Sequence, residues 1–144
     1  MGNCIFCDIV TGHAPASVVY EDAIVVAFLD LGQINPGHIL LVPRVHVSSA
    51  ANMDETTGAH LFTIGLRMDQ AVRRAGVRCE GVNLLLADGA AAGQEVFHTH
   101  LHVVPRFKGD ALKIETGRPV RPSREDLDLT AKHIRRSYES LRRP

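Results

Sequence analysis

The chain has 144 residues, of which 45% are hydrophobic and 22% charged, and its sixteen Lys and Arg balance its sixteen Asp and Glu. This length suits one globular domain over residues 1–144, and the zero net charge gives no electrostatic reason to expect a nucleic-acid or membrane-surface partner. No hydrophobic run approaches the roughly 18–20 residues of a membrane span, and the first residues lack a signal-peptide pattern. We therefore expect a cytoplasmic protein without a nucleic-acid or membrane partner.

The first part of the chain predicts a short helix or turn followed by three antiparallel strands. Three runs are rich in hydrophobic and β-branched residues, and turn-forming residues separate them. We expect the helix or turn at residues 4–10 and the strands at residues 18–20, 23–29 and 38–42.

The rest of the chain predicts two helices and two further strands. Asp54 can cap a helix whose hydrophobic residues recur at helical spacing until Gly76 ends it. Residues 82–86 and 96–104 resemble strands that flank a loop of small residues, and Ser123 can cap a final amphipathic helix. The expected fold class is therefore α+β, with an antiparallel sheet of about five strands, a mid-chain helix and a C-terminal helix.

Three of the eight histidines alternate along the strand predicted at residues 96–104. Side chains two residues apart share one face of a strand, so His98, His100 and His102 are expected to form a row. The outer two would lie roughly 13 Å apart at Cα, which disfavours one metal ion shared by all three. An unprotonated imidazole can instead attack phosphorus while a neighbour binds the phosphoryl oxygens. Half-buried structural histidines and simple metal binding are the alternatives.

Cys4 and Cys7 form a C-x-x-C pair, a pattern found in metal sites and in redox proteins. A thioredoxin-like motif would follow a strand in a β-α-β unit, and the residues here do not predict that context. An odd number of cysteines also argues against a disulfide framework. The pair is therefore open between metal ligation and reduced thiols.

The segment at residues 93–106 resembles the signature of the histidine triad (HIT) family of nucleotide hydrolases and transferases, in which His alternates with hydrophobic residues. Four further motifs occur in the family's order, and the likeness covers nearly the whole chain. They are Cys4 to Val10, Ala27 to Asp30, Pro36 to His38, and Val42 to His46. The resemblance implies the HIT-like fold, a homodimer, and the zinc-containing bacterial type of the adenosine phosphoramidase branch.

The resemblance also implies roles for individual residues. The family's middle histidine is the nucleophile, so His100 is expected to form a covalent nucleotidyl-histidine, and His102 to contact the phosphate. The residues expected around the nucleotide are Ile5, Phe6, Ile9 and Phe28 against the base, Asp30 on the ribose, and Gln94, Glu95 and His102 beside the phosphate. Core packing is the alternative for Ile5, Ile9 and Phe28, and a turn is the alternative for Asp30.

Several bacterial members of the family hold a structural zinc ion with residues that correspond to Cys4, Cys7, His46 and His98. Two thiolates and two imidazoles make a closed, four-coordinate site of the structural type. If His46 and His98 bind zinc, then His100 and His102 remain as the working pair.

The implied function is hydrolysis of purine nucleotide conjugates, such as phosphoramidates and AMP-lysine compounds, with release of AMP or GMP. A dinucleoside polyphosphate hydrolase of the Ap3A or Ap4A type is one alternative. A zinc-stabilised nucleotide-binding or interaction module with little turnover is an alternative of another class.

Two positions depart from the common family pattern. Glu95 stands where many adenosine phosphoramidases carry Ser or Thr, and Ala87 stands where Asn is often found. Both positions lie near the phosphate or the leaving group in the family. The leaving-group preference is therefore the feature that transfers least, and one hypothesis is that Glu95 exchanges a proton or favours an amine-bearing leaving group.

Overall fold

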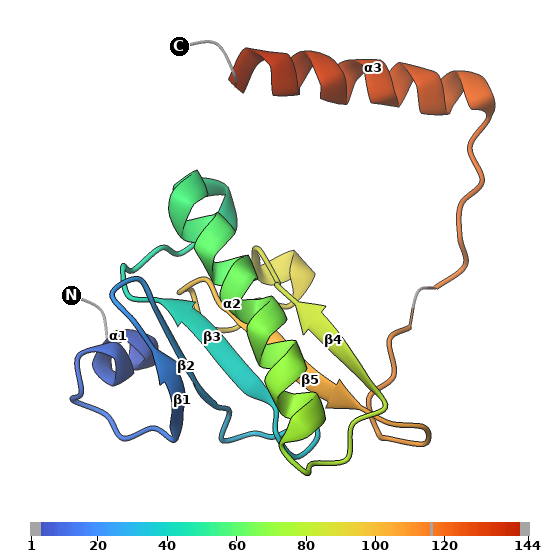
Figure 1. The fold of residues 1–144 in the computed structure, drawn as a ribbon. Helices are drawn as coiled ribbons and strands as arrows, with labels where there is room; N and C mark the ends of the chain where they lie inside the picture. Colours follow the sequence, from blue (N-terminus) through green and yellow to red (C-terminus); the bar gives the residue numbers. More distant parts are fainter. Residues whose placement is uncertain (1–3, 116, 142–144) are drawn as a thin grey trace. The chain divides into compact units, whose positions relative to one another are not determined.

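The computed structural model describes residues 4–115 and 117–141 (Figure 1). Internal contacts divide the chain into a body that extends to Leu112 and a C-terminal segment that begins at Lys113. The single domain expected over residues 1–144 stays a prediction.

The body is built on a five-stranded sheet in which every neighbouring pair is antiparallel. The strands are β1 (Val18–Glu21), β2 (Val25–Leu29), β3 (Ile39–Pro43), β4 (Gly81–Leu85) and β5 (Leu101–Arg106). Their order across the sheet is β1-β2-β3-β5-β4, so β5 lies inside the sheet between β3 and β4. The expected α+β class and the antiparallel sheet are confirmed.

The described residues form three α-helices, and two of them begin at the caps that the sequence predicts. They are α1 (Ile5–Val10), α2 (Glu55–Arg74) and α3 (Arg124–Leu141). The Asp54 carboxylate accepts a hydrogen bond from the backbone N–H of Thr57 at the start of α2. At the start of α3, the Ser123 hydroxyl accepts one from the backbone N–H of Asp126.

The two faces of the sheet carry different cores because side chains alternate along each strand. On the face that α2 crosses (Figure 1), Leu61, Ile64 and Val72 of α2 pack against the strands. Their partners in the sheet are Val25, Ala27, Ile39, Leu41, Leu101 and Val103. The opposite face packs Phe6 of α1 against Val26, Phe28, Leu40 and Val42. His102 lies between Leu101 and Val103 on β5 and opposite Leu40 on β3, so its side chain belongs to the α1 face.

The strand predicted at residues 96–104 is wrong in its first half. β5 begins only at Leu101 and continues through Pro105 to Arg106. In continued register Thr99 would face Pro43, but proline has no N–H to donate to the ladder. The backbone N–H of Thr99 instead donates to the carbonyl of Val47 at 2.7 Å. His98 and His100 therefore lie on an irregular segment that precedes the strand.

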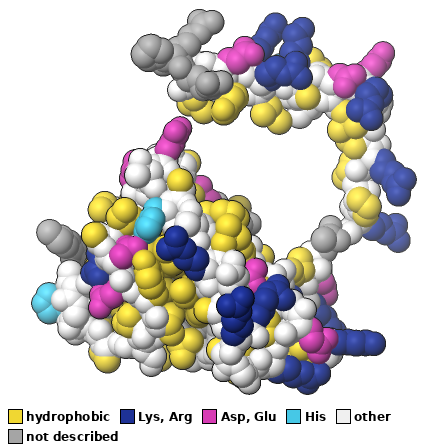
Figure 2. Space-filling view, in the orientation of Figure 1, with side chains coloured by type: hydrophobic (Ala, Val, Ile, Leu, Met, Phe, Trp, Pro, Cys, Tyr) yellow, Lys and Arg dark blue, Asp and Glu magenta, His cyan; other side chains and the backbone are white. Residues whose placement is uncertain are grey.

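The C-terminal segment contains α3, whose hydrophobic side chains lie mainly along one side of the helix (Figure 2). Leu127, Ile134 and Leu141 are exposed, as is every described residue of this helix. The predicted amphipathic stripe is present. Among the described helices, none is both long enough and apolar enough to cross a membrane.

Candidate active site and metal centre

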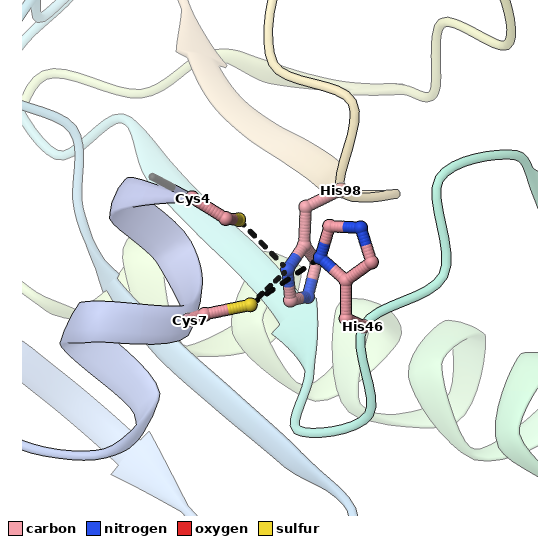
Figure 3. A group of neighbouring side chains, drawn as sticks. All are labelled: Cys4, Cys7, His46 and His98. Carbon is pink, nitrogen blue, oxygen red and sulfur yellow. Dashed lines mark hydrogen bonds between the residues drawn. The ribbon is translucent and has the colours of Figure 1, made fainter. Parts of the chain in front are cut away.

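Two cysteines and two histidines lie close together at the N-terminal end of α1 (Figure 3). Cys4 and Cys7 come from the start of α1, His46 from the loop after β3, and His98 from the irregular segment before β5. One potential ligand atom from each residue lies within 4.8 Å of the other three. The fold thus brings together the four residues that the resemblance implies as zinc ligands.

The distances within this cluster suit a tetrahedral metal site. The Sγ atoms of Cys4 and Cys7 lie 3.4 and 3.6 Å from His98 Nδ1, and Cys7 Sγ lies 3.3 Å from His46 Nδ1. Tetrahedral zinc, with usual bond lengths, would hold sulfur and nitrogen ligands about 3.6 Å apart. The donor set and its spacing therefore fit zinc.

The hydrogen bonding of His98 also suits a metal ligand. Its Nε2–H donates to the Pro43 carbonyl at 2.8 Å, so the Nδ1 lone pair points at the two thiols. Burial lowers the pKa of His98, which favours the neutral imidazole that a metal requires. Burial and the neighbouring Cys4 thiol raise the pKa of Cys7, so metal binding there would displace a proton.

A pocket of about 480 Å³ lies next to this cluster, on the α1 face of the sheet. It is lined by α1, the segments before and along β3, the loop at residues 93–96, and the histidines around the start of β5. Its lining residues are Phe6, Asp30, Gly32, Ile34, His38, Leu40, Gly93, Glu95, Val96, His100 and His102. The Phe6 ring meets the His100 ring edge-on, with 5.1 Å between their centres.

His100 forms its backbone hydrogen bond through Nδ1, whereas His98 forms its own through Nε2. The Nδ1–H of His100 donates to the backbone carbonyl of His98 at 2.7 Å, which leaves the lone pair on Nε2. Its side chain is only 7% exposed, and its ring centre lies 4.8 Å from that of His102. The imidazole is therefore held in one tautomer on the wall of the pocket.

A row of hydrogen bonds sets the tautomer of His102. The backbone N–H of Ile34 donates to His38 Nδ1 at 3.3 Å, so the proton of His38 is on Nε2. That Nε2–H donates to His102 Nδ1 at 2.9 Å, which places the proton of His102 on its own Nε2. His102 thus offers an N–H donor, whereas His100 offers a lone pair.

Burial keeps His38 and His102 neutral near pH 7. It lowers the pKa of His102 to about 4, with further lowering by His100 and His38, and it also lowers the pKa of His38. Asp30 lies 3.6 Å from His38 Nδ1 and opposes these shifts. Asp30, His38 and His102 also have ligand atoms within 4.8 Å of one another, but hydrogen bonds occupy both nitrogens of His38, which favours a relay over a second metal centre.

The residues expected around the nucleotide fall into two groups. Phe6, Asp30, Glu95 and His102 line the pocket, together with His100. The other four do not belong to its lining: Ile5 is 48% exposed, Ile9 and Phe28 pack in the core of the α1 face, and Gln94 is buried. The Gln94 amide accepts from Gly89 N–H and donates to the carbonyls of Ser48 and Val96, which positions the loop beside the pocket.

For His38, at the end of the motif Pro36 to His38, the sequence predicts only a structural hydrogen bond. That bond exists, but His38 also lines the pocket and orients His102. A signal was present, because His38 lies two residues before Leu40 and shares its face of the sheet. Using it required the register that places Leu40 opposite His102.

The model of the HIT domain matches residues 11–109, and the chain therefore belongs to the HIT domain family. A solved protein from Streptococcus mutans is 38% identical, with a TM-score of 0.89 over 96% of this chain and 87% of that chain. A zinc-bound histidine triad family protein from Mycobacterium smegmatis is 36% identical, with a TM-score of 0.74 over 96% of this chain and 97% of that chain. An adenylylsulfatase from Arabidopsis thaliana is 34% identical over 76% of this chain and 55% of that protein. The family resemblance and the fold expected from the sequence are confirmed.

Proposed function

We propose that the protein hydrolyses conjugates of purine nucleotides through a covalent intermediate on His100. The observation that carries this proposal is the pairing of opposite tautomers in one pocket, where His100 has its lone pair and His102 its proton on Nε2. A nucleophile beside a hydrogen-bond donor is the arrangement that phosphorus transfer needs. Membership of a family that includes an adenylylsulfatase supports the same class of reaction.

The proposed reaction has two steps. His100 Nε2 attacks the α-phosphorus and forms a P–N bond, while the bond from phosphorus to the leaving group breaks and a leaving amine takes up a proton from solvent water. His102 Nε2–H donates to a phosphoryl oxygen in both steps. Water then attacks phosphorus, the bond to His100 breaks, and AMP or GMP is released. Phosphoramidates and AMP-lysine compounds are the proposed substrates, with Asp30 on the ribose and Phe6 against the base.

We further propose that Cys4, Cys7, His46 and His98 hold a structural zinc ion. Such an ion would supply no step of the reaction, since four protein ligands close its coordination. It would fasten α1 and the loop after β3 to the segment that carries His100. The thiolate ligands stay reduced in the cytoplasm, which is the compartment we propose.

We also propose a homodimer that forms through α2 and the outer edge of β4. Phe62 and Leu66 on α2 are 53% and 45% exposed, and Leu86, just after β4, is 40% exposed. Figure 2 views the face that α2 covers and shows hydrophobic side chains gathered on it. In the described part of the chain, β4 has a strand on one side only. A Phe62→Glu variant should shift the molecular mass in solution from dimer to monomer, measured by light scattering.

A substrate panel tests the proposed activity. Adenosine 5′-phosphoramidate, AMP-lysine, diadenosine tri- and tetraphosphate, and the guanosine analogues are each incubated with the protein, and nucleotide release is measured. We expect release from the phosphoramidates, a transient mass increase of one nucleotidyl group, and loss of both in His100→Ala. Preferred turnover of the dinucleoside polyphosphates would replace the proposed substrate class. Tight AMP binding without turnover of any conjugate would overturn the proposal that the protein is an enzyme.

A further inference from the structure

The pocket has a charge imbalance. Its lining contains two carboxylates, Asp30 and Glu95, and no Lys or Arg among the described residues. Two of its imidazoles, His38 and His102, are kept neutral near pH 7 by burial that lowers the pKa of each. His100 must also be unprotonated when it acts as the nucleophile. A pocket that binds an anionic phosphate therefore has a wall whose fixed charges are negative.

The two carboxylates differ in what they already contact. Asp30 accepts a hydrogen bond from the backbone N–H of Gly32 at 2.9 Å and lies beside His38. Glu95 is exposed, and no hydrogen bond or ion pair joins its carboxylate to any residue in the described ranges. Since Asp30 is proposed to bind the ribose, Glu95 is the carboxylate of the pocket that remains for the leaving group.

The backbone around Glu95 is nevertheless held in place. Its neighbour Gln94 is 5% exposed, and its side-chain amide makes three hydrogen bonds, to Gly89 N–H and to the carbonyls of Ser48 and Val96. The residues on both sides of Glu95, Gln94 and Val96, are thus fixed. Glu95 lines the same pocket as His100, the proposed nucleophile.

We propose that Glu95 selects conjugates whose leaving group carries a positive charge and disfavours leaving groups that carry phosphates. This inference rests on the proposed function and deepens it, because it assigns the leaving-group class to one residue. A carboxylate near the departing group attracts an ammonium and repels an anion. A cation on the substrate would also offset the repulsion between the phosphate and the two wall carboxylates. Since Glu95 is exposed, the effect should be modest and weakened by salt.

A series of three AMP conjugates tests this selection while holding the broken bond constant. AMP is joined through a P–N bond to 1,4-diaminobutane, n-butylamine or 4-aminobutyrate, so that the far end of the leaving group is cationic, neutral or anionic. The measured quantity is kcat/KM for AMP release at low salt. We expect the cationic conjugate to exceed the neutral one, and the neutral one to exceed the anionic one, by about two- to fivefold per step.

Variants at Glu95 assign the preference to its charge. In Glu95→Gln the ratios between conjugates should approach one, and in Glu95→Lys their order should reverse. The matched control is Glu80→Gln. The Glu80 carboxylate is exposed, lies outside the pocket lining, and forms an ion pair with Arg78 at 3.8 Å. That control should keep the ratios of the unmodified protein. High salt should compress the ratios in the unmodified protein because it screens the exposed charge.

The outcomes separate this inference from the proposed function. Equal kcat/KM values for the three conjugates, or ratios that persist in Glu95→Gln, would overturn the role of Glu95 while hydrolysis itself still stood. Hydrolysis of the neutral conjugate that disappears in His100→Ala would support the proposed function independently of Glu95. Failure to hydrolyse any of the three would overturn the proposed function and this inference with it.

Discussion

His98 and His100 are two residues apart on one irregular segment, yet they are hydrogen-bonded to the backbone through opposite ring nitrogens. His98 donates from Nε2 to the Pro43 carbonyl and turns Nδ1 toward the cysteines. His100 donates from Nδ1 to the carbonyl of His98 and leaves Nε2 without its proton. The comparison teaches that the hydrogen-bonded nitrogen, more than the residue type, decides whether an imidazole suits a metal cluster or a reactive pocket.

Of the changes proposed here, replacing His100 should have the largest effect on activity. In His100→Asn the side-chain amide can still donate to the His98 carbonyl, but it supplies no nucleophile. We expect kcat for AMP release to fall by at least about 1000-fold, because covalent catalysis is lost. Zinc content per chain, measured by elemental analysis, should stay unchanged. A parallel loss of zinc would contradict the separation of the two sites.

Removing the proposed zinc ion should act on stability first. In Cys4→Ser, or after chelation, we expect the free energy of unfolding in urea to fall by about 3–4 kcal/mol. This is the stabilisation expected from a ligand whose free concentration is several hundred times its Kd. Cys79→Ser is the matched control, since Cys79 donates to the Gly81 carbonyl outside the cluster. That control should cost about 1 kcal/mol and keep its zinc. Equal losses in both variants would rule out a structural metal.

Acid should reveal the buried neutral state of His102. Its pKa is about 4 in the folded protein, against about 6.5 in an unfolded chain, so the unfolded state binds more protons between these values. The free energy of unfolding should therefore fall by roughly 2–3 kcal/mol as the pH drops from 6.5 to 4. The measurement is urea unfolding at several pH values, compared with His102→Gln. Other groups titrate in both proteins, so a difference between the two that does not change with pH would contradict the assignment.

The smallest expected effect sharpens the role of His38. In His38→Phe no N–H reaches His102 Nδ1, so the tautomer of His102 is no longer set, and we expect kcat to fall about tenfold. Gln at this position can both accept from Ile34 N–H and donate to His102. His38→Gln should therefore restore most of the lost rate. Equal losses in Phe and Gln variants, measured as kcat and KM with the phosphoramidate, would point to a packing role alone.

Local patterns were enough to predict much of the fold. Alternating hydrophobic residues located the strands, and the polar caps Asp54 and Ser123 marked where two helices begin. The start of β5 was missed because Pro43, which has no N–H to donate, lies far from β5 in the sequence. No period along residues 96–104 carries that information.

The candidate site divides in the same way. The residue types and the family resemblance pointed to the cysteine and histidine cluster and to the reactive pair, which the fold brings close together. Phe28 and Ile9 do not belong to the pocket lining: Phe28 is buried in the core of the α1 face and Ile9 packs against it. A pocket wall and a core have the same hydrophobic character in sequence, so the contact of these two residues with the base stays a prediction. The relay through His38 depends on strand register, which is a property of the folded sheet.

The proline at the end of β3 has a consequence for how such sites arise. A regular strand forces every second side chain onto one face, so histidines two residues apart would be bound to similar surroundings. Because Pro43 ends the ladder before Thr99, the side chains of His98 and His100 can point in different directions and bind different partners. A designer who wants adjacent identical residues to perform unlike tasks should begin by interrupting the strand that carries them.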